Sequence, residues 1–486
     1  MRAALFLFSA ALSAQSDELA SKSHQAKELM GAGRFTDAVP IYEQLCRALP
    51  RNTGLRLNLG LALQMSGMNQ KAIPQFEQVL KAEPNNEPAL LSLGASLLEI
   101  GDGAKSVPPL MKLVNLHPDN VNARGLLAQA LLASSRLKEA SVQYRKLTSL
   151  TPDSPKAWFG SGQVYELLSK HAFEELNRTA EGSAEWLALV GESRIGQRQY
   201  RSAFFFYQQA LKKQPNLSGA HAALATIYRA TEHAEWAEVE ELRETALAGP
   251  NCIHDKRECD LAAGRLLDAA SSHSAYVRSR AYNYLAVQAF STLGKLPESI
   301  ESHALKAEIF ESHGQYLEAV SEWRSALALA PQDSPLDKEL AKALYLAHDF
   351  EHALPAIERL SKRDVSAADF QFFAGDCLFH LERLEEAIPY LTTALKLKPA
   401  MLPAHSALGL IYARLGKTSE AIPHLQAALP SDDDGSLHYQ LARVYQASGE
   451  TEKAQRMIAK YQEIRSRSEA EEHKLEKEAV ITAPQL

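Results

Sequence analysis

Long apolar stretches are missing from this sequence, and cysteine, glycine and proline are scarce. No run approaches the roughly 18 apolar residues that a membrane-spanning helix requires, so no transmembrane segment is expected. Four cysteines in 486 residues are too few for a disulfide scaffold. The 24 glycines and 22 prolines are fewer than average usage predicts, which argues against a loop-rich or all-β design and favours helices.

An excess of basic charge is also missing. The 52 Lys and Arg residues are outnumbered by 59 Asp and Glu residues, which gives a formal net charge of -7. The one dense charge run, residues 465–478, mixes both signs. Proteins that bind nucleic acid usually carry a basic excess or a basic stripe, so we expect no nucleic-acid partner.

What the sequence does contain is an internal repeat. Small residues recur at a constant interval, at Gly60, Gly94, Ala128 and Gly162 (94 − 60, 128 − 94 and 162 − 128 are equal). A proline follows 24 residues after each of the first three, at Pro84, Pro118 and Pro152. Between them, apolar residues keep the i, i+3, i+4 spacing of two amphipathic helices. One such hairpin cannot bury its apolar face alone, so the hairpins are expected to stack on one another.

These residues resemble the tetratricopeptide repeat (TPR), a helix-turn-helix unit of about 34 residues, and the interval between the small residues equals that length. The resemblance implies an all-α fold, a right-handed superhelical solenoid of stacked hairpins. It covers about three quarters of the chain. Copies of the repeat begin near Leu19, Thr53, Glu87, Val121, Ala184, Ser218, Ile300, Ser334, Ala368, Leu402 and Gly435.

The frame departs from this pattern in two places. A unit begins at Pro155, but the next one begins at Ala184, before a full interval has passed, so the second helix of the first, over residues 172–180, should be short or skewed. Over residues 251–299 the frame is lost, although helical patterns remain at 259–270 and 275–293. This middle segment is either a degenerate helix pair that keeps the stack continuous or a hinge between two arms.

The two ends add further expectations. Arg2, the apolar run 3–12 and the small residue Ser13 predict a signal peptide over residues 1–14. The protein should then be exported, periplasmic or secreted as in bacteria; if the segment is no signal, the protein is cytoplasmic. The predicted division of the chain is the signal at 1–14, a first array at 19–251, the divergent middle at 252–299, a second array at 300–468 and a charged tail at 469–486.

The cysteines allow one disulfide. Cys252 and Cys259 lie seven residues apart, and in an exported protein they could close a small ring that stabilises the fold by about 2–3 kcal/mol. A metal site that combines them with His254 lacks the paired CxxC spacing of zinc modules. Cys46 and Cys377 occupy helical positions and are interpreted as packed thiols.

Signs of catalysis are few. His348, Glu351 and His352 match the HxxEH pattern of one metalloprotease group. That chemistry requires both histidines on one continuous helix, whereas the repeat frame places His348 in a turn. We therefore expect no enzyme, catalytic residue, metal or cofactor, with a metal-dependent hydrolase as an unfavoured alternative.

Binding is the remaining function. The resemblance implies that the first helix of each hairpin lines a concave groove for a protein or peptide partner. In the first array those positions are Ser23, Lys27, Asn58, Leu61, Pro88 and Ser92, so the basic clamp that some relatives use for a C-terminal carboxylate is missing. The second array is richer in aromatic and charged residues, and we expect its groove to bind the partner. The candidate residues are Lys338, Lys342, Tyr345, Phe372, Asp376, Phe379, Arg414, Tyr439 and Arg443. Self-association into an envelope assembly is the structural alternative.

Overall fold

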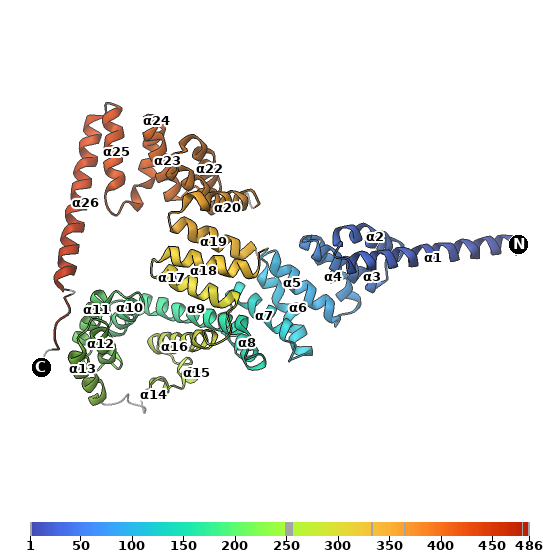
Figure 1. Ribbon diagram of the computed structural model, residues 1–486, viewed down its shortest axis with the longest axis horizontal. Helices are drawn as coiled ribbons and strands as arrows, with labels where there is room; N and C mark the ends of the chain where they lie inside the picture. The colour runs from blue at the N-terminus through green and yellow to red at the C-terminus, as the bar shows by residue number, and fades with distance from the viewer. Residues whose placement is uncertain (1, 248–255, 332–333, 364–365, 479, 485–486) are drawn as a thin grey trace. The chain divides into compact units, whose positions relative to one another are not determined.

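The computed structural model describes residues 2–247, 256–331, 334–363, 366–478 and 480–484. In this part of the chain it contains 26 α-helices, one short 3-10 helix and no strand, so the predicted all-α solenoid is confirmed (Figure 1). The helices form two compact units. Unit 1 contains Met1–Ala172 and Gly264–Leu296, and unit 2 contains Phe173–Ala263 and Pro297–Leu486. This division follows packing, whereas the division predicted above follows the repeat frame along the chain.

Unit 1 consists of four complete antiparallel hairpins and the first part of a longer helix. Its helices are α1 (Arg2–Gly31), α2 (Phe35–Ala48), α3 (Thr53–Met65), α4 (Asn69–Ala82), α5 (Glu87–Glu99), α6 (Gly103–Leu116), α7 (Val121–Ala133), α8 (Leu137–Leu150), α9 (Pro155–Ala180, as far as Ala172), α15 (Leu266–Ala269) and α16 (Ala275–Leu293). Three of the first helices, α3, α5 and α7, begin at the residues where the repeat frame predicts them.

The start of these helices is fixed by asparagine caps that share the period of the repeat. Asn52, Asn86 and Asn120 each accept a hydrogen bond at 3.0 Å from the backbone N–H three residues ahead. Such a cap satisfies one of the N–H groups that a helix leaves without an intrahelical partner. The turn inside the hairpin is set by a residue in the left-handed region, such as Gly67 with φ +73°. Cap and turn together explain why the hairpins recur at a constant interval.

Each hairpin closes through a glycine on its first helix. Phe76 covers Gly60 and Leu110 covers Gly94, and a Cβ built on either glycine would overlap with the covering side chain. Phe76 and Leu110 are both 0% exposed. The close approach of the two helices therefore requires the glycine, because any side chain there would push the helices apart.

The repeat that begins at Pro155 departs from this arrangement. The short or skewed second helix predicted over residues 172–180 is not formed, because α9 continues without a break through those residues. The second helix is instead supplied by α16, which lies against the first part of α9 (Figure 1). Phe290 of α16 occupies the space where a Cβ on Gly162 would lie. Gly162 and Phe290 thus repeat the contact of Gly60 with Phe76, although they are much farther apart in the sequence.

Further contacts support the pairing of α9 with α16. The rings of Tyr165 and Tyr282 stack with their centroids 6.3 Å apart. The hydroxyl of Ser169 donates to the carbonyl oxygen of Ser279 at 2.9 Å. The predicted helical pattern at 275–293 is therefore a helix whose partner is α9. Whether the middle segment also acts as a hinge stays a prediction.

Unit 2 contains the remainder of the chain. Its helices, besides the end of α9, are α10 (Ala184–Gly196), α11 (Tyr200–Lys213), α12 (Ala220–Ala230), α13 (Ala234–Ala246), α14 (Lys256–Ala262), α17 (Ile300–Ser312), α18 (Tyr316–Leu329), α19 (Ser334–Leu346), α20 (Phe350–Arg363), α21 (Ala368–His380), α22 (Leu384–Leu397), α23 (Leu402–Arg414), α24 (Thr418–Ala428), the 3-10 helix η1 (Leu429–Ser431), α25 (Ser436–Ala447) and α26 (Thr451–Glu478). Its glycine contacts follow the rule of unit 1, with Leu391 over Gly375 and Leu425 over Gly409.

Candidate functional site

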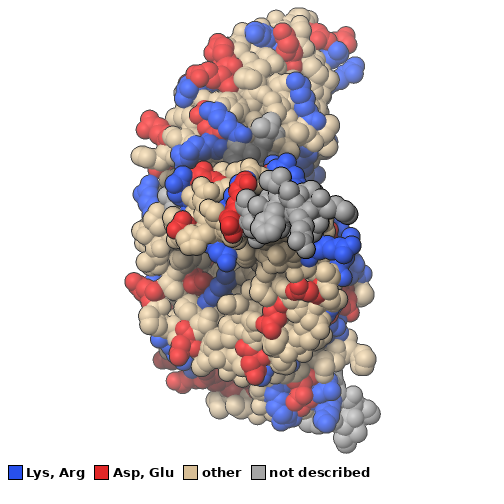
Figure 2. Space-filling model, turned by 90° about the vertical axis from the view of Figure 1, so that its right-hand side faces the viewer, with Lys and Arg blue, Asp and Glu red and all other residues tan. Residues whose placement is uncertain are grey.

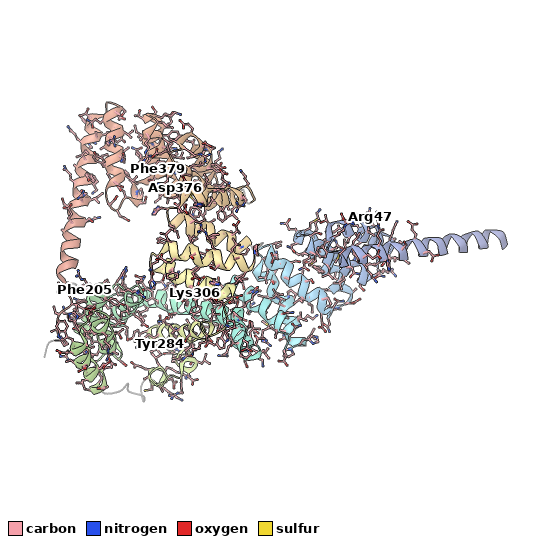
Figure 3. All side chains as sticks on the ribbon, viewed as in Figure 1. Arg47, Phe205, Tyr284, Lys306, Asp376 and Phe379 are labelled. Atoms are coloured by element: carbon pink, nitrogen blue, oxygen red, sulfur yellow. The ribbon has the colours of Figure 1, made fainter. Side chains whose placement is uncertain are left out.

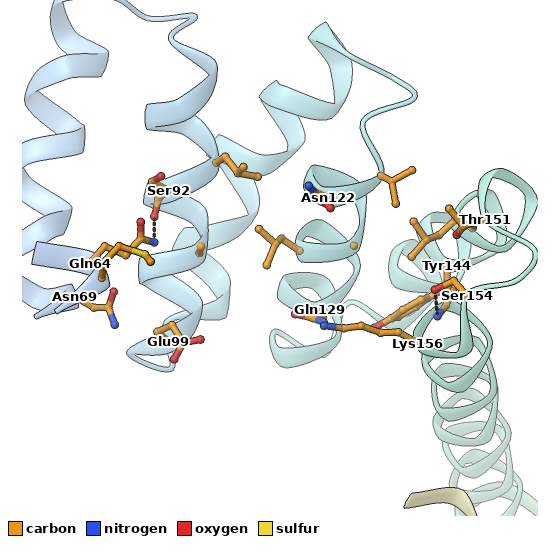
Figure 4. A pocket seen from close by; sticks show the side chains of 18 of the residues that line it. Gln64, Asn69, Ser92, Glu99, Asn122, Gln129, Tyr144, Thr151, Ser154 and Lys156 are labelled. Carbon is orange, nitrogen blue, oxygen red and sulfur yellow. Dashed lines mark hydrogen bonds between the residues drawn. The ribbon is translucent and has the colours of Figure 1, made fainter. Parts of the chain in front are cut away.

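The first helices of the repeats in unit 1 line a hollow. α3, α5, α7 and the start of α9, with parts of α8 and its following loop, enclose a cavity of about 890 Å³ (Figure 4). We call this cavity the first-array groove. The sequence analysis predicted Ser92 as a groove-lining residue but expected the partner to bind in the second array.

Small residues on α5 and α7 leave space in the groove. Ser92 and Ala95 of α5 and Gly125 of α7 all border it. No heavy atom lies within 4 Å of a Cβ built on Gly125, in contrast to Gly94, where Leu110 fills that space. Packing between the helices therefore does not explain a glycine at position 125, and its effect is to keep the groove open. A run of small residues on successive first helices is the signal by which the sequence could have revealed this site.

Polar groups in the groove are mostly uncharged amides and hydroxyls, the hydroxyls being those of Ser92, Tyr144, Thr151 and Ser154. Gln64, Asn69, Asn122 and Gln129 line it, together with one acid and one base, Glu99 and Lys156. Gln64 donates through Nε2 to the carbonyl oxygen of Ser92 at 3.2 Å, which joins α3 to α5 (Figure 4). Asn69 has a buried Oδ1 with no hydrogen-bond partner among the described residues. A buried acceptor without a donor is costly, so this atom is suited to receive an N–H group from a ligand.

The predicted partner residues of the second array contact one another between successive repeats. Tyr345 of α19 donates its hydroxyl proton to Asp376 Oδ2 of α21 at 2.7 Å. The ring of Tyr345 also contacts Phe373, with centroids 4.7 Å apart. Phe372 lies beside Phe373 on the same helix and is half-buried. Phe373 was missed by sequence reasoning, which assigned the inward face to its neighbour.

Asp376 has an unusual environment. Burial raises the pKa of its carboxyl group, although the hydrogen bond from Tyr345 and the nearby His380 and His348 act to lower it. His380 Nε2 lies 3.5 Å from Asp376 Oδ2, and the His380 ring stacks on Phe350 at 4.5 Å. Burial also raises the pKa of Tyr345, which keeps its hydroxyl a proton donor.

The remaining predicted residues follow along the second array. Figure 3 labels Phe379 next to Asp376 on α21. Phe379 is 6% exposed and is covered by Arg414, whose guanidinium carbon lies 4.6 Å from the ring centroid. Arg414 also forms an ion pair with Glu382 at 2.8 Å. These contacts tie α21 to α23, so both residues stabilise the stack whatever else they bind.

At the two ends of the predicted set the side chains are more exposed. Lys338 Nζ lies 6.0 Å from the centroid of Phe370, and Lys342 forms an ion pair with Glu311 at 3.4 Å. Tyr439 is 42% exposed, and its ring lies 5.4 Å from that of Tyr461. Arg443 is exposed.

The HxxEH pattern is divided by a turn. His348 has φ +56° and lies between α19 and α20, whereas His352 lies inside α20 and its Nδ1 is 2.8 Å from Asp349 Oδ1. The two histidines therefore do not share one continuous helix. In the described part of the chain, no group of three or more His, Cys, Asp or Glu side chains is placed to bind a metal ion.

The structure tests the predictions for two of the four cysteines. Cys46 and Cys377 are buried free thiols, and burial raises the pKa of Cys377 to about 12. Cys252 and His254 lie outside the described residues, so the disulfide from Cys252 to Cys259 stays a prediction.

The surface charges are mixed. On the face drawn in Figure 2, Lys and Arg side chains lie among Asp and Glu side chains, without one large patch of a single sign. No helix of the described residues is both long enough and apolar enough to cross a membrane.

Comparison with known proteins gives one consistent family. Two family models, both described as tetratricopeptide repeat, match residues 338–401 in one case and residues 29–97 and 378–438 in the other. No curated protein matches the sequence. Among solved structures, MamA from Desulfovibrio magneticus RS-1 is 24% identical, with 30% of this chain and 84% of that chain covered and a TM-score of 0.30. A tetratricopeptide repeat protein from Parabacteroides merdae is 11% identical, with 67% and 98% covered and a TM-score of 0.33.

Proposed function

Because the chain is a tetratricopeptide repeat protein, a family of protein-interaction scaffolds, we propose that it binds an extended segment of a protein partner in the first-array groove. The observation that carries this proposal is the combination of open space beside Gly125 with the unpartnered Oδ1 of Asn69 in one cavity. We propose further that the chain acts without catalysis. The separation of His348 from His352 supports that view.

The lining defines the chemistry of the partner. Leu91 and Leu126 offer apolar contact, and the amides of Asn122 and Gln129 can both donate and accept hydrogen bonds. Main-chain N–H and C=O groups of an extended peptide have the same mixed character. The single acid and single base give no preference for a strongly charged ligand. The partner segment should therefore be extended, largely neutral and bear small apolar side chains.

A steric block at Gly125 tests this proposal. Gly125→Leu places a side chain in the groove, and it should not disturb the helix packing because the space beside the glycine is empty. Gly31→Leu is the matched control, since a Cβ on Gly31 also meets nothing within 4 Å and this residue does not line the groove. In pull-downs from the envelope fraction of the host, quantified by mass spectrometry, we expect partners retained by the wild type and Gly31→Leu to be lost at least tenfold with Gly125→Leu. Equal retention by all three proteins would contradict the groove as the site.

The groove of the second array is the alternative binding site for the partner, and its aromatic residues are the observation in its favour. Tyr345, Phe372, Phe379 and Arg443 would be its central anchors, with Lys338, Lys342, Asp376, Arg414 and Tyr439 around them. Aromatic and arginine side chains are the usual hot spots of protein interfaces. Replacing Phe372 and Phe379 together by Ala should then weaken binding by at least about 2 kcal/mol. Under the same proposal, Leu61→Ala with Ser92→Ala in the first array should have little effect, and circular dichroism must show both variants folded.

The place of action is a separate proposal. We propose that residues 1–14 are a signal peptide and that the protein works outside the cytoplasm; the apolar run 3–12 after Arg2 supports this. N-terminal sequencing of protein expressed in its host should give a mature start near Ala14 or Gln15. An intact Met1 in a cytoplasmic fraction would contradict export. Metal analysis of the purified protein separates the scaffold from the hydrolase alternative, and its oligomeric state separates it from a self-assembling envelope component.

A further inference from the structure

Residues 480–484, which follow α26, lie against helices of unit 2 from a much earlier part of the sequence (Figure 1). The hydroxyl of Tyr228 on α12 donates to the carbonyl oxygen of Thr482 at 2.7 Å. Val480 and Ile481 border a cavity of about 770 Å³, together with the start of α11 and the turn between α12 and α13. One hydrogen bond and one shared cavity, whose lining includes Arg198 and Arg201, therefore place this segment beside α11, α12 and the turn before α13.

The tyrosine that binds the segment is closely packed by other aromatic rings. Tyr228 is 1% exposed, and its ring is fixed between Phe204 at 5.7 Å and Trp236 at 5.6 Å. Trp236 in turn stacks on His233, which borders the cavity, at 4.2 Å. The buried tyrosine thus presents a hydroxyl group in a fixed position. Burial raises the pKa of Tyr228 to about 12, so this hydroxyl remains a donor at neutral pH.

The polar contact recognises the main chain of its occupant. Tyr228 binds a carbonyl group of residue 482, which every peptide possesses, and not the threonine side chain. Specificity must come from the two side chains before it, the β-branched Val480 and Ile481. β-branched residues favour extended backbone, and Pro484 restricts it further, so such a segment loses little conformational entropy on binding.

The same contact is weak enough to be exchanged. Val480 is 55% exposed and Ile481 only half-buried, so little apolar area holds the segment. Its occupancy must depend on its attachment to the chain, because a tether raises the local concentration of a weak ligand to the millimolar range.

We propose that the start of α11 and the turn between α12 and α13 form a second peptide-binding site, which residues 480–484 occupy as a tethered ligand. The partner that this site fits is an extended peptide with two adjacent β-branched apolar residues and no basic side chain, because Arg198 and Arg201 line the cavity. Such a partner must displace residues 480–484, so the chain controls access to the site. This inference does not depend on the first-array groove, which lies in unit 1 and shares no residue with the site.

The test uses a chain that ends at Glu478 and a fluorescein-labelled peptide of residues 480–486, with binding followed by fluorescence polarisation. The shortened chain should bind the peptide roughly tenfold more tightly than the full chain, because the tethered competitor has been removed. Tyr228→Phe in the shortened chain should weaken binding several-fold. Tyr445→Phe is the matched control, since it removes a tyrosine hydroxyl that contacts Gln426 far along the second array, and it should change nothing.

A second variant leaves the site itself untouched. Ile481→Lys in the full chain should expel the segment, because Arg198 and Arg201 line the same cavity and would repel the added charge, and it should restore peptide binding to the level of the shortened chain. Ala483→Lys is its control, because Ala483 is exposed and does not border the cavity. Equal affinity of the full and shortened chains, or no effect of Ile481→Lys, would overturn the proposal. So would unchanged binding by a folded Tyr228→Phe variant.

Discussion

The α5–α6 hairpin and the α9–α16 pair contain the same close contact with very different connections. In the hairpin, Leu110 covers Gly94 across a sequence gap of 16; in the pair, Phe290 covers Gly162 across a gap of 128 (110 − 94 and 290 − 162). The glycine and the covering side chain have the same role in both. What the repeat requires is therefore a complementary pair of helix faces, and the chain between them can be replaced by other helices.

The cost of the longer connection is modest. The sequence gap grows by a factor of eight, which is three doublings, and each doubling of a flexible loop costs about 0.6 kcal/mol in closure entropy. A total of about 1.8 kcal/mol is comparable to the burial of one large side chain. The intervening residues form helices of their own, so their ends are constrained and the true cost is lower. An insertion into a hairpin is thus compatible with a stable stack.

Overpacking the glycine should destabilise both the α5–α6 hairpin and the α9–α16 pair. Gly94→Trp and Gly162→Trp each place an indole where a side chain already fills the space, and each should cost about 3 kcal/mol or more. Glu99→Lys, on the exposed end of α5, should stay within about 0.5 kcal/mol. Urea unfolding followed by circular dichroism measures all three. If Gly162→Trp proved as mild as Glu99→Lys, α16 would not be packed on α9.

Truncating the covering side chain should have a smaller effect. Leu110→Ala removes a side chain that is 0% exposed and should cost about 3 kcal/mol, within the usual range for a buried leucine. Phe290 is half-buried, so Phe290→Ala should cost less, about 2 kcal/mol. The same unfolding experiment ranks the two variants. A neutral Phe290→Ala variant would show that the distant pair contributes nothing to stability.

The smallest expected effect concerns a polar contact between successive repeats, the hydrogen bond from Tyr345 to Asp376. Burial raises the pKa of Asp376 in the folded chain, so between the ordinary aspartate value of about 3.9 and the raised value the folded state binds more protons than the unfolded state. Stability from this group is therefore present at low pH and is lost as the pH rises through that window. Asp376→Asn keeps an acceptor for Tyr345 but removes the titration.

Urea midpoints of the wild type and Asp376→Asn, measured at several values from pH 4 to pH 7, check this expectation. The wild type should lose stability relative to the variant as the pH rises. A difference that stayed constant over this range would contradict the buried, ionisable contact described for Asp376.

Much of the fold could be predicted because the repeat carries local signals. The helix starts at Thr53, Glu87 and Val121 follow from a constant period, and each is confirmed by an asparagine cap. The pairing of α9 with α16 could not be predicted in this way. Periodicity along the chain shows that residues 275–293 form a helix, but it contains no information on which distant helix faces them.

The candidate site likewise could not be predicted from the sequence pattern alone. Large aromatic residues such as Phe379 were predicted to bind the partner because such residues are common in interfaces. In the folded chain, however, Phe379 is covered by Arg414. The first-array groove depends instead on what its residues lack, above all the side chain at Gly125. A missing side chain becomes visible only when neighbouring helices show whether the space beside it is filled.

A designed disulfide between α9 and α16 tests whether α16 supplies the second helix of the repeat that begins at Pro155. The hydroxyl oxygens of Ser169 and Ser279 lie 3.1 Å apart, so cysteines at both positions, in a chain whose native cysteines are replaced by alanine, should be able to join. Ser169→Cys with Val287→Cys is the control, because Val287 is 58% exposed on α16. We predict that mild oxidation links positions 169 and 279 within one chain, seen as a faster band on a non-reducing gel, and leaves the control pair unlinked. Free thiols at 169 and 279 in a chain that circular dichroism shows to be folded would contradict the account.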